Sequence, residues 1–425
     1  MTTKRLLSAA LALVLGAGLL SGCAKGEGTS SSGASSQGSA SSAQEETIDL
    51  SQVKDPYLTA AGIPGDTVVA KVGEYDITAG ELLYRLNARV EQYLYQYQSM
   101  GFSLTELPWD MDIEGETLEA VIMEDALQTA AWFRLAPELG AEEGLELSQE
   151  ELDYPNQVVE AFTQELGSEE LMHHYLWYQM VTQEVFIRLC QAGSMHQMLQ
   201  DKYFGEDSGN YPTDAEAAAY AQDELGCYRA KHILLRTVDE ETREPLEEAV
   251  IAQKKATAEE LLSQLRAAQD PVALFDQLMN QYSEGPGLAT APDGYDTYKG
   301  QMVPEFENAA LALKDGEISD IVESEWGYHI ILRLPLELDQ FRSELAAVRM
   351  QEKVDKWLED YPVQTTGELE KIDLPSFRAK VVLIQNAVSQ EWQGLDSTGS
   401  SAGSGGSSAS GSGGGSAAGA GSQGS

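Results

Sequence analysis

The run SEWGYHIILR, from Ser324 to Arg333, places a histidine at the start of a β-rich apolar stretch. Imidazole changes its charge closest to neutral pH, so His329 could exchange protons or serve as an oriented hydrogen-bonding group. The alternative is a core histidine that has simply found one hydrogen-bond partner. His329 by itself leaves both interpretations open, and the elements around it must decide between them.

The pattern from Gly226 onward predicts an α+β module over residues 226–337. A strand holding CYRAKHILLRT comes first and a closing strand comes last, so His232 and His329 lie at opposite ends of the module. Helical periodicity and a proline at a first helical turn indicate the helices between them. The expected order is β-α-α-α-β-β, with helices at 244–268, 271–283 and 304–314, a Gly/Pro-rich loop at 284–300 and the closing strand at 328–334.

The segments on either side of this module are mainly α-helical. Alternation predicts a short strand from Val68 to Val72, and Thr78 with Glu81 forms a capping box that begins a helix. The region 66–225 then carries helical patterns at 79–100, 116–139, 148–165, 168–203 and 213–225, and the pattern returns at 338–395. We therefore expect the module to be inserted in a mostly α-helical domain, because the ends of a domain often lie close together.

The N-terminus has the composition of an export signal. Lys4 and Arg5 precede an apolar run of 15 residues, LLSAALALVLGAGLL, which is too short to span a bilayer comfortably. The following LSGC resembles the bacterial lipobox, in which Cys23 would become the acylated first residue of the mature chain. The alternative is an ordinary signal peptide with an incidental cysteine. Residues 1–23 are thus predicted to be a lipoprotein signal, 24–65 a disordered Ser/Gly-rich tether and 396–425 a disordered Gly/Ser tail.

The charge balance excludes some partners. The 425 residues carry 69 acidic and 27 basic side chains, a formal net charge of −42. No broad surface for neutralising phosphates is available at that balance, so we expect no nucleic-acid partner.

No metal or cofactor is predicted. The acidic turn at Asp110 and Asp112 begins like a calcium loop, but Val121 stands where a bidentate glutamate is required, so a solvated turn is favoured. Cys190 and Cys227 lie in no zinc-type spacing and either pair or remain free thiols.

Three motifs in order carry a family resemblance. AKHILL at 230–235, GQMVPEFENAALALKDGEIS at 300–319 and WGYHII at 326–331 resemble the parvulin family of peptidyl-prolyl cis/trans isomerases. The match covers roughly residues 228–336. With a lipobox and helical flanks, the whole arrangement resembles the PrsA-type extracytoplasmic foldase lipoproteins, in which the flanks join into one chaperone domain.

The resemblance implies a site. His232 and His329 would lie side by side beneath it, with Ser324 bonded to the second imidazole. Met302 and Phe306 match the residues of the family's proline pocket, with Gln301 beside them in the same run; their alternative is plain core packing.

Two positions depart from the family pattern. Gly285 stands where parvulins carry Cys or Asp, and the neighbouring Glu284 is the candidate to supply the acidic group instead. Asp293 takes the place of a pocket leucine.

The resemblance therefore implies a foldase, anchored through Cys23 to the outer face of the cell membrane, that binds unfolded exported chains and isomerises X–Pro bonds without a cofactor. The alternative is a holdase whose module only binds extended polypeptide. A homodimer is compatible with the resemblance, and the sequence does not decide it.

Overall fold

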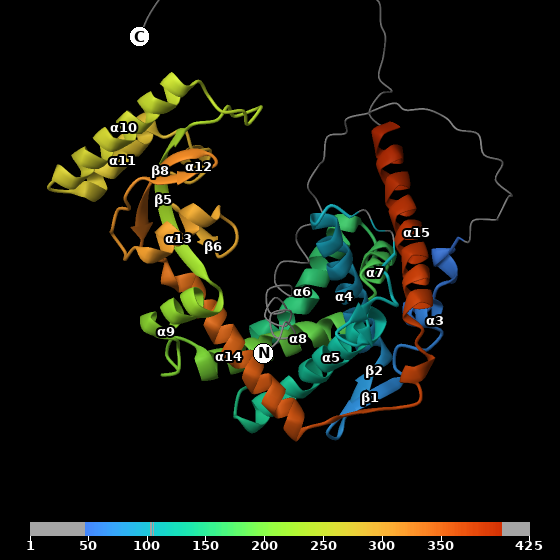
Figure 1. The fold of residues 1–425 in the computed structure, drawn as a ribbon. Helices are drawn as coiled ribbons and strands as arrows, with labels where there is room; N and C mark the ends of the chain where they lie inside the picture. Colours follow the sequence, from blue (N-terminus) through green and yellow to red (C-terminus); the bar gives the residue numbers. More distant parts are fainter. Residues whose placement is uncertain (1–46, 103, 105, 402–425) are drawn as a thin grey trace, which may run out of the picture. The chain divides into compact units, whose positions relative to one another are not determined.

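A computed structural model describes residues 47–401 apart from residues 103 and 105. The predicted signal, Cys23, the first part of the tether and the tail from 402 lie outside the described residues. Within that range the chain forms two compact units, one of residues 197–357 and the other of residues 47–196 together with 358–401 (Figure 1).

The first unit is built on a four-stranded antiparallel sheet in the order β6-β5-β8-β7. Its two central strands carry the β-branched and apolar residues that favour extended backbone. In their register His232 faces Ile331, and Leu234 faces His329. The strands are β5 (Cys227–Arg236), β6 (Tyr295–Tyr298), β7 (Val322–Ser324) and β8 (Gly327–Leu334).

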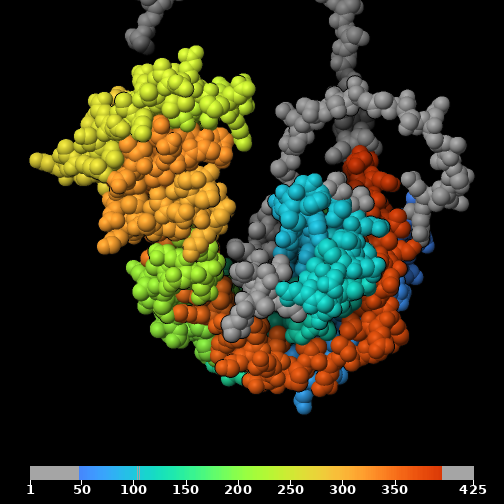
Figure 2. Space-filling view, viewed as in Figure 1, coloured from blue at the N-terminus to red at the C-terminus, as the bar shows by residue number. Residues whose placement is uncertain are grey.

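Helices cover both faces of this sheet. On one face α10 (Glu248–Ala267) and α11 (Pro271–Tyr282) bury Ile233, Ile330 and Leu332 in the larger core. Figure 2 shows these two helices, in yellow, as a layer against the orange segment that holds α13 and β8. On the other face α13 (Pro304–Ala312) packs against residues of β5 and β8. Alternate side chains of a strand point to opposite faces, so His232 and His329 share the α13 face.

The remaining elements of this unit frame the sheet. Ala217, Tyr220 and Phe341 form a separate buried cluster with Cys227 at the beginning of β5. They belong to the short helix α9, the π-helical turn η3 and the long helix α14. The bounds are α9 (Asp214–Ala219), η3 (Tyr220–Glu224), α12 (Gly287–Thr290) and α14 (Leu338–Asp360).

The stretch predicted as a loop, 284–300, contains secondary structure. It holds the short helix α12 and the edge strand β6, where Thr297 is buried and pairs with Tyr228 of β5. Gly and Pro dominate the local pattern, and a four-residue strand offers too few alternations to stand out against them. The prediction of an irregular loop was therefore wrong in part, and the module has one strand more than expected.

The second unit is mainly helical around a small sheet in the order β2-β1-β9. Thr78 caps α4 in the predicted capping box with Glu81. The elements up to residue 204 are η2 (Leu50–Gln52), α3 (Pro56–Ala61), β1 (Val68–Val72), β2 (Tyr75–Thr78), α4 (Ala79–Ser99), β3 (Asp112–Ile113), β4 (Glu116–Thr117), α5 (Leu118–Glu142), α6 (Gln149–Leu166), α7 (Glu169–Tyr178) and α8 (Gln183–Phe204). The elements after residue 360 are β9 (Val363–Thr365), η4 (Leu369–Lys371) and α15 (Leu374–Ser401).

Residues from both ends of the sequence meet in this second unit. β9 pairs antiparallel with β1, placing Val363 beside Val72. The guanidinium of Arg378 on α15 lies 2.6 Å from the Glu91 carboxylate on α4. The chain thus returns to its N-terminal sheet after residue 357, as a chain with an internal insertion must.

Three predicted segments differ from the structure. Residues 50–65 are folded, not part of a disordered tether: Asp55 caps α3, and Tyr57 is 2% exposed with its hydroxyl accepting from the Thr182 amide at 2.9 Å. The prediction extended the Ser/Gly-rich composition of the preceding residues over this segment and overlooked its apolar residues, which are buried. The helix predicted at 168–203 is split into α7 and α8, with Met180 at a φ of +56° between them.

The C-terminal segment also differs. Residues 338–395 are interrupted by β9 and η4, and α15 continues to Ser401, beyond the predicted border at 395. The compact unit 197–357 is wider at both ends than the predicted module 226–337. Among residues 47–401, 103 and 105 aside, no helix has both the length and the hydropathy needed to cross a bilayer.

Candidate active site

Two histidines from the two central strands meet on the α13 face of the sheet. The ring centroids of His232 on β5 and His329 on β8 lie 5.3 Å apart, and the ring planes are inclined by 67°. The antiparallel register places His329 opposite Leu234, one same-face position along β5 from His232. The pairing of the strands therefore brings together two residues that are far apart in the sequence.

Each imidazole has a hydroxyl partner. The Ser324 hydroxyl lies 2.7 Å from Nε2 of His329, and the Tyr295 hydroxyl lies 2.7 Å from Nδ1 of His232. The amide of Trp326 already donates to Ser324 Oγ at 3.2 Å, which leaves the Ser324 proton free to point at His329. The sequence did not point to Tyr295, because the strand β6 that carries it was not predicted. The short alternation from Tyr295 to Tyr298 was the local signal for that strand, in which Thr297 is buried.

Both histidines are held neutral at pH 7. His329 is 4% exposed, and this burial lowers its pKa to about 4. Burial and, to a smaller extent, the neighbouring His329 together lower the pKa of His232 to about 3. A buried imidazolium would lose its hydration without gaining a counter-charge, which is the physical cause of both shifts. The pair can therefore orient hydrogen bonds at pH 7 but does not present a positive charge.

An aromatic ring closes the site from the side of α13. The Phe306 ring stands edge-on to both imidazoles, with centroid distances of 5.2 Å to His232 and 5.6 Å to His329. Phe306 is 2% exposed, whereas Met302, which precedes α13, is only partly buried against the same apolar cluster. The two residues thus form an apolar wall whose outer part is open to a ligand.

Gln301 fastens the end of β6 to the beginning of α13. Its side-chain oxygen accepts from the Tyr298 amide at 3.1 Å and from the Thr297 hydroxyl at 3.2 Å. The side chain itself is exposed beside Met302. Gln301 therefore positions the chain that carries the apolar wall.

Glu284 points away from the histidines. One carboxylate oxygen accepts from the Arg236 amide at 2.7 Å, and the other pairs with the ammonium of Lys254. The Glu284 amide donates to the Leu234 carbonyl at 2.8 Å. These contacts tie the end of α11 to β5, and they do not bring the carboxylate to either imidazole.

Gly285 lies directly over the first histidine. A Cβ atom at this position would be 3.0 Å from Nε2 of His232, so any side chain here would touch the imidazole. Asp293 is exposed in the turn before β6. The absence of a side chain at Gly285 is therefore the departure from the family pattern that bears most directly on the site.

Other sites of chemistry are scarce in the described part of the chain. Residues 47–401, without 103 and 105, contain no group of three or more His, Cys, Asp or Glu side chains that could hold a metal ion. Cys190 and Cys227 are both free, and burial raises the pKa of each thiol to about 11. Unpaired, poorly ionised thiols of this kind act as small apolar side chains.

Comparison with known proteins agrees with this geometry. Residues 232–334 match the model of the Rotamase family, described as the PPIC-type PPIase domain. The foldase protein PrsA of Geobacillus sp. is 34% identical over 168 residues, which cover 36% of this chain and 52% of the relative. The foldase protein PrsA of Bacillus subtilis is 32% identical over 146 residues, covering 34% of this chain and 43% of that protein.

Among solved structures, the peptidylprolyl isomerase PrsA from Bacillus cereus is similar at 18% identity over 64% of this chain and 97% of that one, with a TM-score of 0.26. The chain spans about half the length of the PrsA proteins of Geobacillus sp., Geobacillus kaustophilus and Bacillus subtilis. The chain contains a PPIC-type PPIase domain of the parvulin type, set in an α+β protein that resembles the PrsA foldases.

Proposed function

We propose that this chain is an extracytoplasmic foldase that binds unfolded exported polypeptides and catalyses cis/trans isomerisation of their X–Pro bonds. The observation that carries the proposal is the pair of neutral imidazoles in contact above Phe306, each held by a hydroxyl. We assign His232, His329 and Ser324 to the catalytic site, and Met302 with Phe306 to the proline pocket. Gln301 and Glu284 position the loops beside it.

The reaction requires modest chemistry. Rotation about an X–Pro bond has a barrier of about 18–20 kcal/mol because the amide must lose its resonance. No bond to carbon is made or broken, so no nucleophile, metal or cofactor is needed. An apolar pocket disfavours the polar, resonance-stabilised amide, and oriented dipoles can favour the twisted one. A thousandfold acceleration corresponds to only about 4 kcal/mol.

The site meets these requirements with groups of low charge. Neutral imidazoles add oriented N–H and lone-pair dipoles to an otherwise apolar surface, whereas imidazolium ions would draw in water. The partly exposed Met302 offers room for the proline ring against the buried Phe306. We infer that the histidine pair shapes and polarises the floor of the pocket and does not transfer protons.

A protease-coupled proline assay on the full chain tests the proposal. A peptide with one X–Pro bond should reach its cis/trans equilibrium faster with the wild-type chain than in buffer. Phe306→Ala should abolish most of that difference, because it removes the wall of the pocket. A rate equal to buffer for the wild-type chain would refute catalysis.

A holdase is the second candidate, and Gly285 is the observation that favours it. In this hypothesis, the absence of a side chain at Gly285, beside His232, leaves the pocket able to bind polypeptide but slow to isomerise its X–Pro bonds. The two functions separate in one pair of measurements. A holdase suppresses aggregation of an unfolded client without changing the rate of proline isomerisation.

Membrane anchoring through Cys23 belongs to the same proposal and rests on the lipobox-like LSGC. Cys23→Ala should shift the chain from the membrane fraction to the soluble fraction of an expressing bacterium. An unchanged distribution would refute lipid attachment at this residue.

A further inference from the structure

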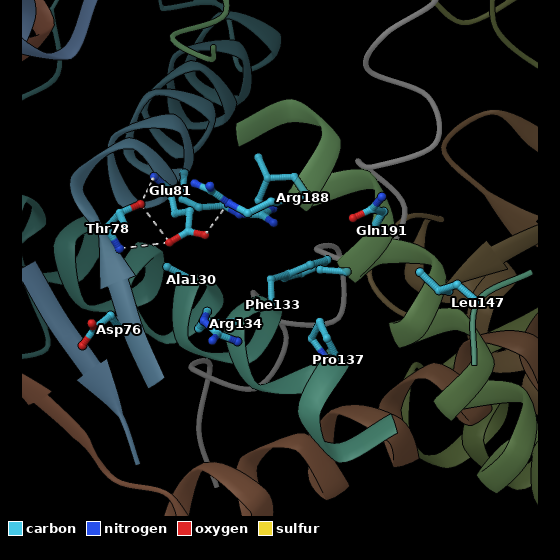
Figure 3. A pocket seen from close by; sticks show the side chains of 13 residues that line it. Asp76, Thr78, Glu81, Ala130, Phe133, Arg134, Pro137, Leu147, Arg188 and Gln191 are labelled. Atoms are coloured by element: carbon cyan, nitrogen blue, oxygen red, sulfur yellow. Dashed lines mark hydrogen bonds and ion pairs between the residues drawn. The ribbon is translucent and has the colours of Figure 1, made fainter. Parts of the chain in front are cut away.

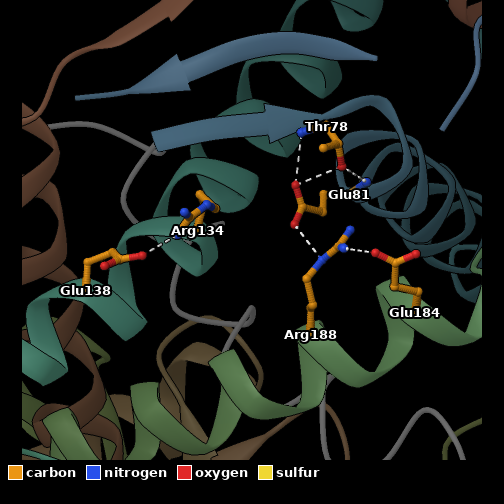
Figure 4. A network of polar contacts seen from close by, with 6 residues as sticks. All are labelled: Thr78, Glu81, Arg134, Glu138, Glu184 and Arg188. Carbon is orange, nitrogen blue, oxygen red and sulfur yellow. Dashed lines mark hydrogen bonds and ion pairs between the residues drawn. The ribbon is translucent and has the colours of Figure 1, made fainter. Parts of the chain in front are cut away.

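The helical unit contains a cavity of about 440 Å³ whose wall carries both arginines and carboxylates (Figure 3). Arg188 lies between Glu81, at 3.3 Å from its Nε, and Glu184, at 2.6 Å from its Nη1 (Figure 4). Arg134 pairs with Glu138 at 2.9 Å. These charges are compensated within the protein, so they select no ligand.

The isomerase site is different, because one of its four imidazole nitrogen atoms is both unpaired and open. Nε2 of His329 lies 2.7 Å from the Ser324 hydroxyl, and Nδ1 of His232 lies 2.7 Å from the Tyr295 hydroxyl. Nδ1 of His329 is buried without a partner, so a substrate cannot reach it. Nε2 of His232 also has no hydrogen-bond partner among the described residues, but its side chain is partly exposed and this atom is not fully buried. It is therefore the imidazole nitrogen that remains for a substrate.

Gly285 keeps this nitrogen open. A Cβ atom at Gly285 would lie 3.0 Å from Nε2 of His232, and the next neighbouring residue, Ser283, would contribute its Oγ at 3.4 Å. In the family pattern a Cys or Asp side chain starts from this position and would lie in front of Nε2. In this chain the same space is free for a group of the substrate.

The register of the sheet brings Tyr295 to the other nitrogen of the same ring. Tyr295 lies opposite Ala230 where β6 pairs with β5, so it is a diagonal neighbour of His232 on one face of the sheet. Aromatic side chains can reach across such a diagonal, and the two ring centroids lie 6.1 Å apart at an inclination of 86°. The Tyr295 ring also lies against the backbone of α12, where a Cβ atom at Gly287 would be 3.6 Å away. Contacts with β5 and α12 thus hold the phenol at Nδ1.

The direction of this hydrogen bond follows from what each group offers. Burial raises the pKa of the Tyr295 phenol above its ordinary value, so the hydroxyl keeps its proton at pH 7. His232 is neutral at that pH and carries one proton on its two nitrogen atoms. The Tyr295 hydroxyl has no other hydrogen-bond partner among the described residues, so its proton finds an acceptor within the site when it points at Nδ1. Donation to Nδ1 leaves the imidazole proton on Nε2.

We propose that Tyr295 is a positioning residue of the isomerase, which fixes His232 as the Nε2–H tautomer and so aims an N–H donor into the proline pocket. The inference rests on the proposed function. His232 borders the apolar wall, with its ring centroid 5.2 Å from that of Phe306, so the donor lies beside the place assigned to the proline ring. When the X–Pro amide twists, its nitrogen regains a lone pair, and a preorganised donor next to it stabilises that state.

NMR of the ring nitrogen atoms in the full-length chain tests the tautomer without reference to catalysis. At pH 7 His232 should carry its proton on Nε2, and the loss of its signals in His232→Gln identifies them. Tyr295→Phe keeps the ring and removes only the hydroxyl, so the Nδ1 signal should shift and a share of Nδ1–H should appear. Tyr298→Phe is the matched control, because Tyr298 belongs to the same strand but packs in the cluster around Cys227. It should leave the tautomer unchanged.

The proline assay shows whether this tautomer matters for the reaction. With N-acetyl-Ala-Ala-Pro-Phe-amide as substrate, Tyr295→Phe should lower kcat at least fivefold and leave KM within twofold, because the hydroxyl does not belong to the apolar wall. Tyr298→Phe should preserve both constants. A rise in KM alone would assign Tyr295 to the wall of the pocket and refute the positioning role.

Two further results would overturn the proposal. The first is a wild-type chain in which His232 carries its proton on Nδ1, a measurement that does not depend on the folding of Tyr295→Phe. The second is a folded Tyr295→Phe chain with the kcat of the wild type. An inactive wild-type chain would refute the proposed function and this inference with it, whereas equal activity of wild type and variant would refute the inference alone.

Discussion

Substituting Gly285 by aspartate should change the titration of His232 more than any other single change near the site. The Gly285 backbone lies outside the left-handed region, so an L-residue fits its conformation. The new Cβ would lie 3.0 Å from Nε2 of His232, so the imidazole ring must move away by a few tenths of an ångström. The carboxylate would then lie roughly 4 Å from the imidazole.

The size of the effect follows from Coulomb's law. Two unit charges about 4 Å apart interact by about 4 kcal/mol at an effective dielectric constant near 20. Since one pKa unit corresponds to about 1.4 kcal/mol, this attraction would raise the pKa of the imidazole by about three units. The pKa of His232 should therefore rise from about 3 to the neighbourhood of 6.

NMR titration of the histidine ring signals measures this directly. The chain has five histidines, and the signal that disappears in His232→Gln identifies the one of interest. Gly285→Asn is the matched control, because it adds a side chain of the same size without a charge and should leave the pKa low. If the aspartate and asparagine variants are both folded and give the same His232 pKa, the close approach of Gly285 to this imidazole is refuted.

Three further predictions concern the same unit. Because His232 and His329 have pKa values below 6.5 when folded, the unfolded chain binds more protons between about pH 6.5 and pH 4, so stability falls as the pH falls through that window. The share of the free energy of unfolding lost through His329 approaches about 3 kcal/mol at pH 4. Hydrogen exchange of the β5 and β8 amides should therefore be faster relative to the unprotected rate at pH 4.5 than at pH 7. The variant His329→Gln should show a shallower dependence of this protection on pH. His329→Ala should reduce proline isomerisation and stability far more than His173→Ala, because His173 is exposed; equal effects in the assay and in thermal unfolding would contradict the site. Glu284→Gln should leave the isomerisation rate within about twofold and cost about 1 kcal/mol in urea unfolding, since its carboxylate holds Arg236 and Lys254 and not the histidines; a rate loss of tenfold or more would restore a catalytic role.

Local patterns determined much of this protein. The alternation around His232 and His329 predicted β5 and β8, and the capping box at Thr78 predicted the start of α4. These signals depend only on neighbours within a few residues, because strand alternation and helix capping are local. The motifs around both histidines were also sufficient to suggest the isomerase module.

Other features depended on residues that meet only after folding. The composition of the segment before residue 66 hid α3, whose Tyr57 is buried against elements distant in the sequence. The loop prediction concealed β6, which becomes a strand because β5 offers it an edge for hydrogen bonding. Tyr295 thereby reaches His232, a contact that no spacing along the chain indicated.

The sequence alone determined which residue types were available and which short elements they form. Only the tertiary structure decided that Glu284 turns toward Lys254 while Gly285 faces the imidazole, although the two are adjacent in the chain. It also decided that Arg85, unremarkable within a helical pattern, is buried with its Nε and Nη2 atoms unpaired. The physical reason is that the burial and pairing of a charge are set by the surrounding elements, and these come from distant parts of the chain.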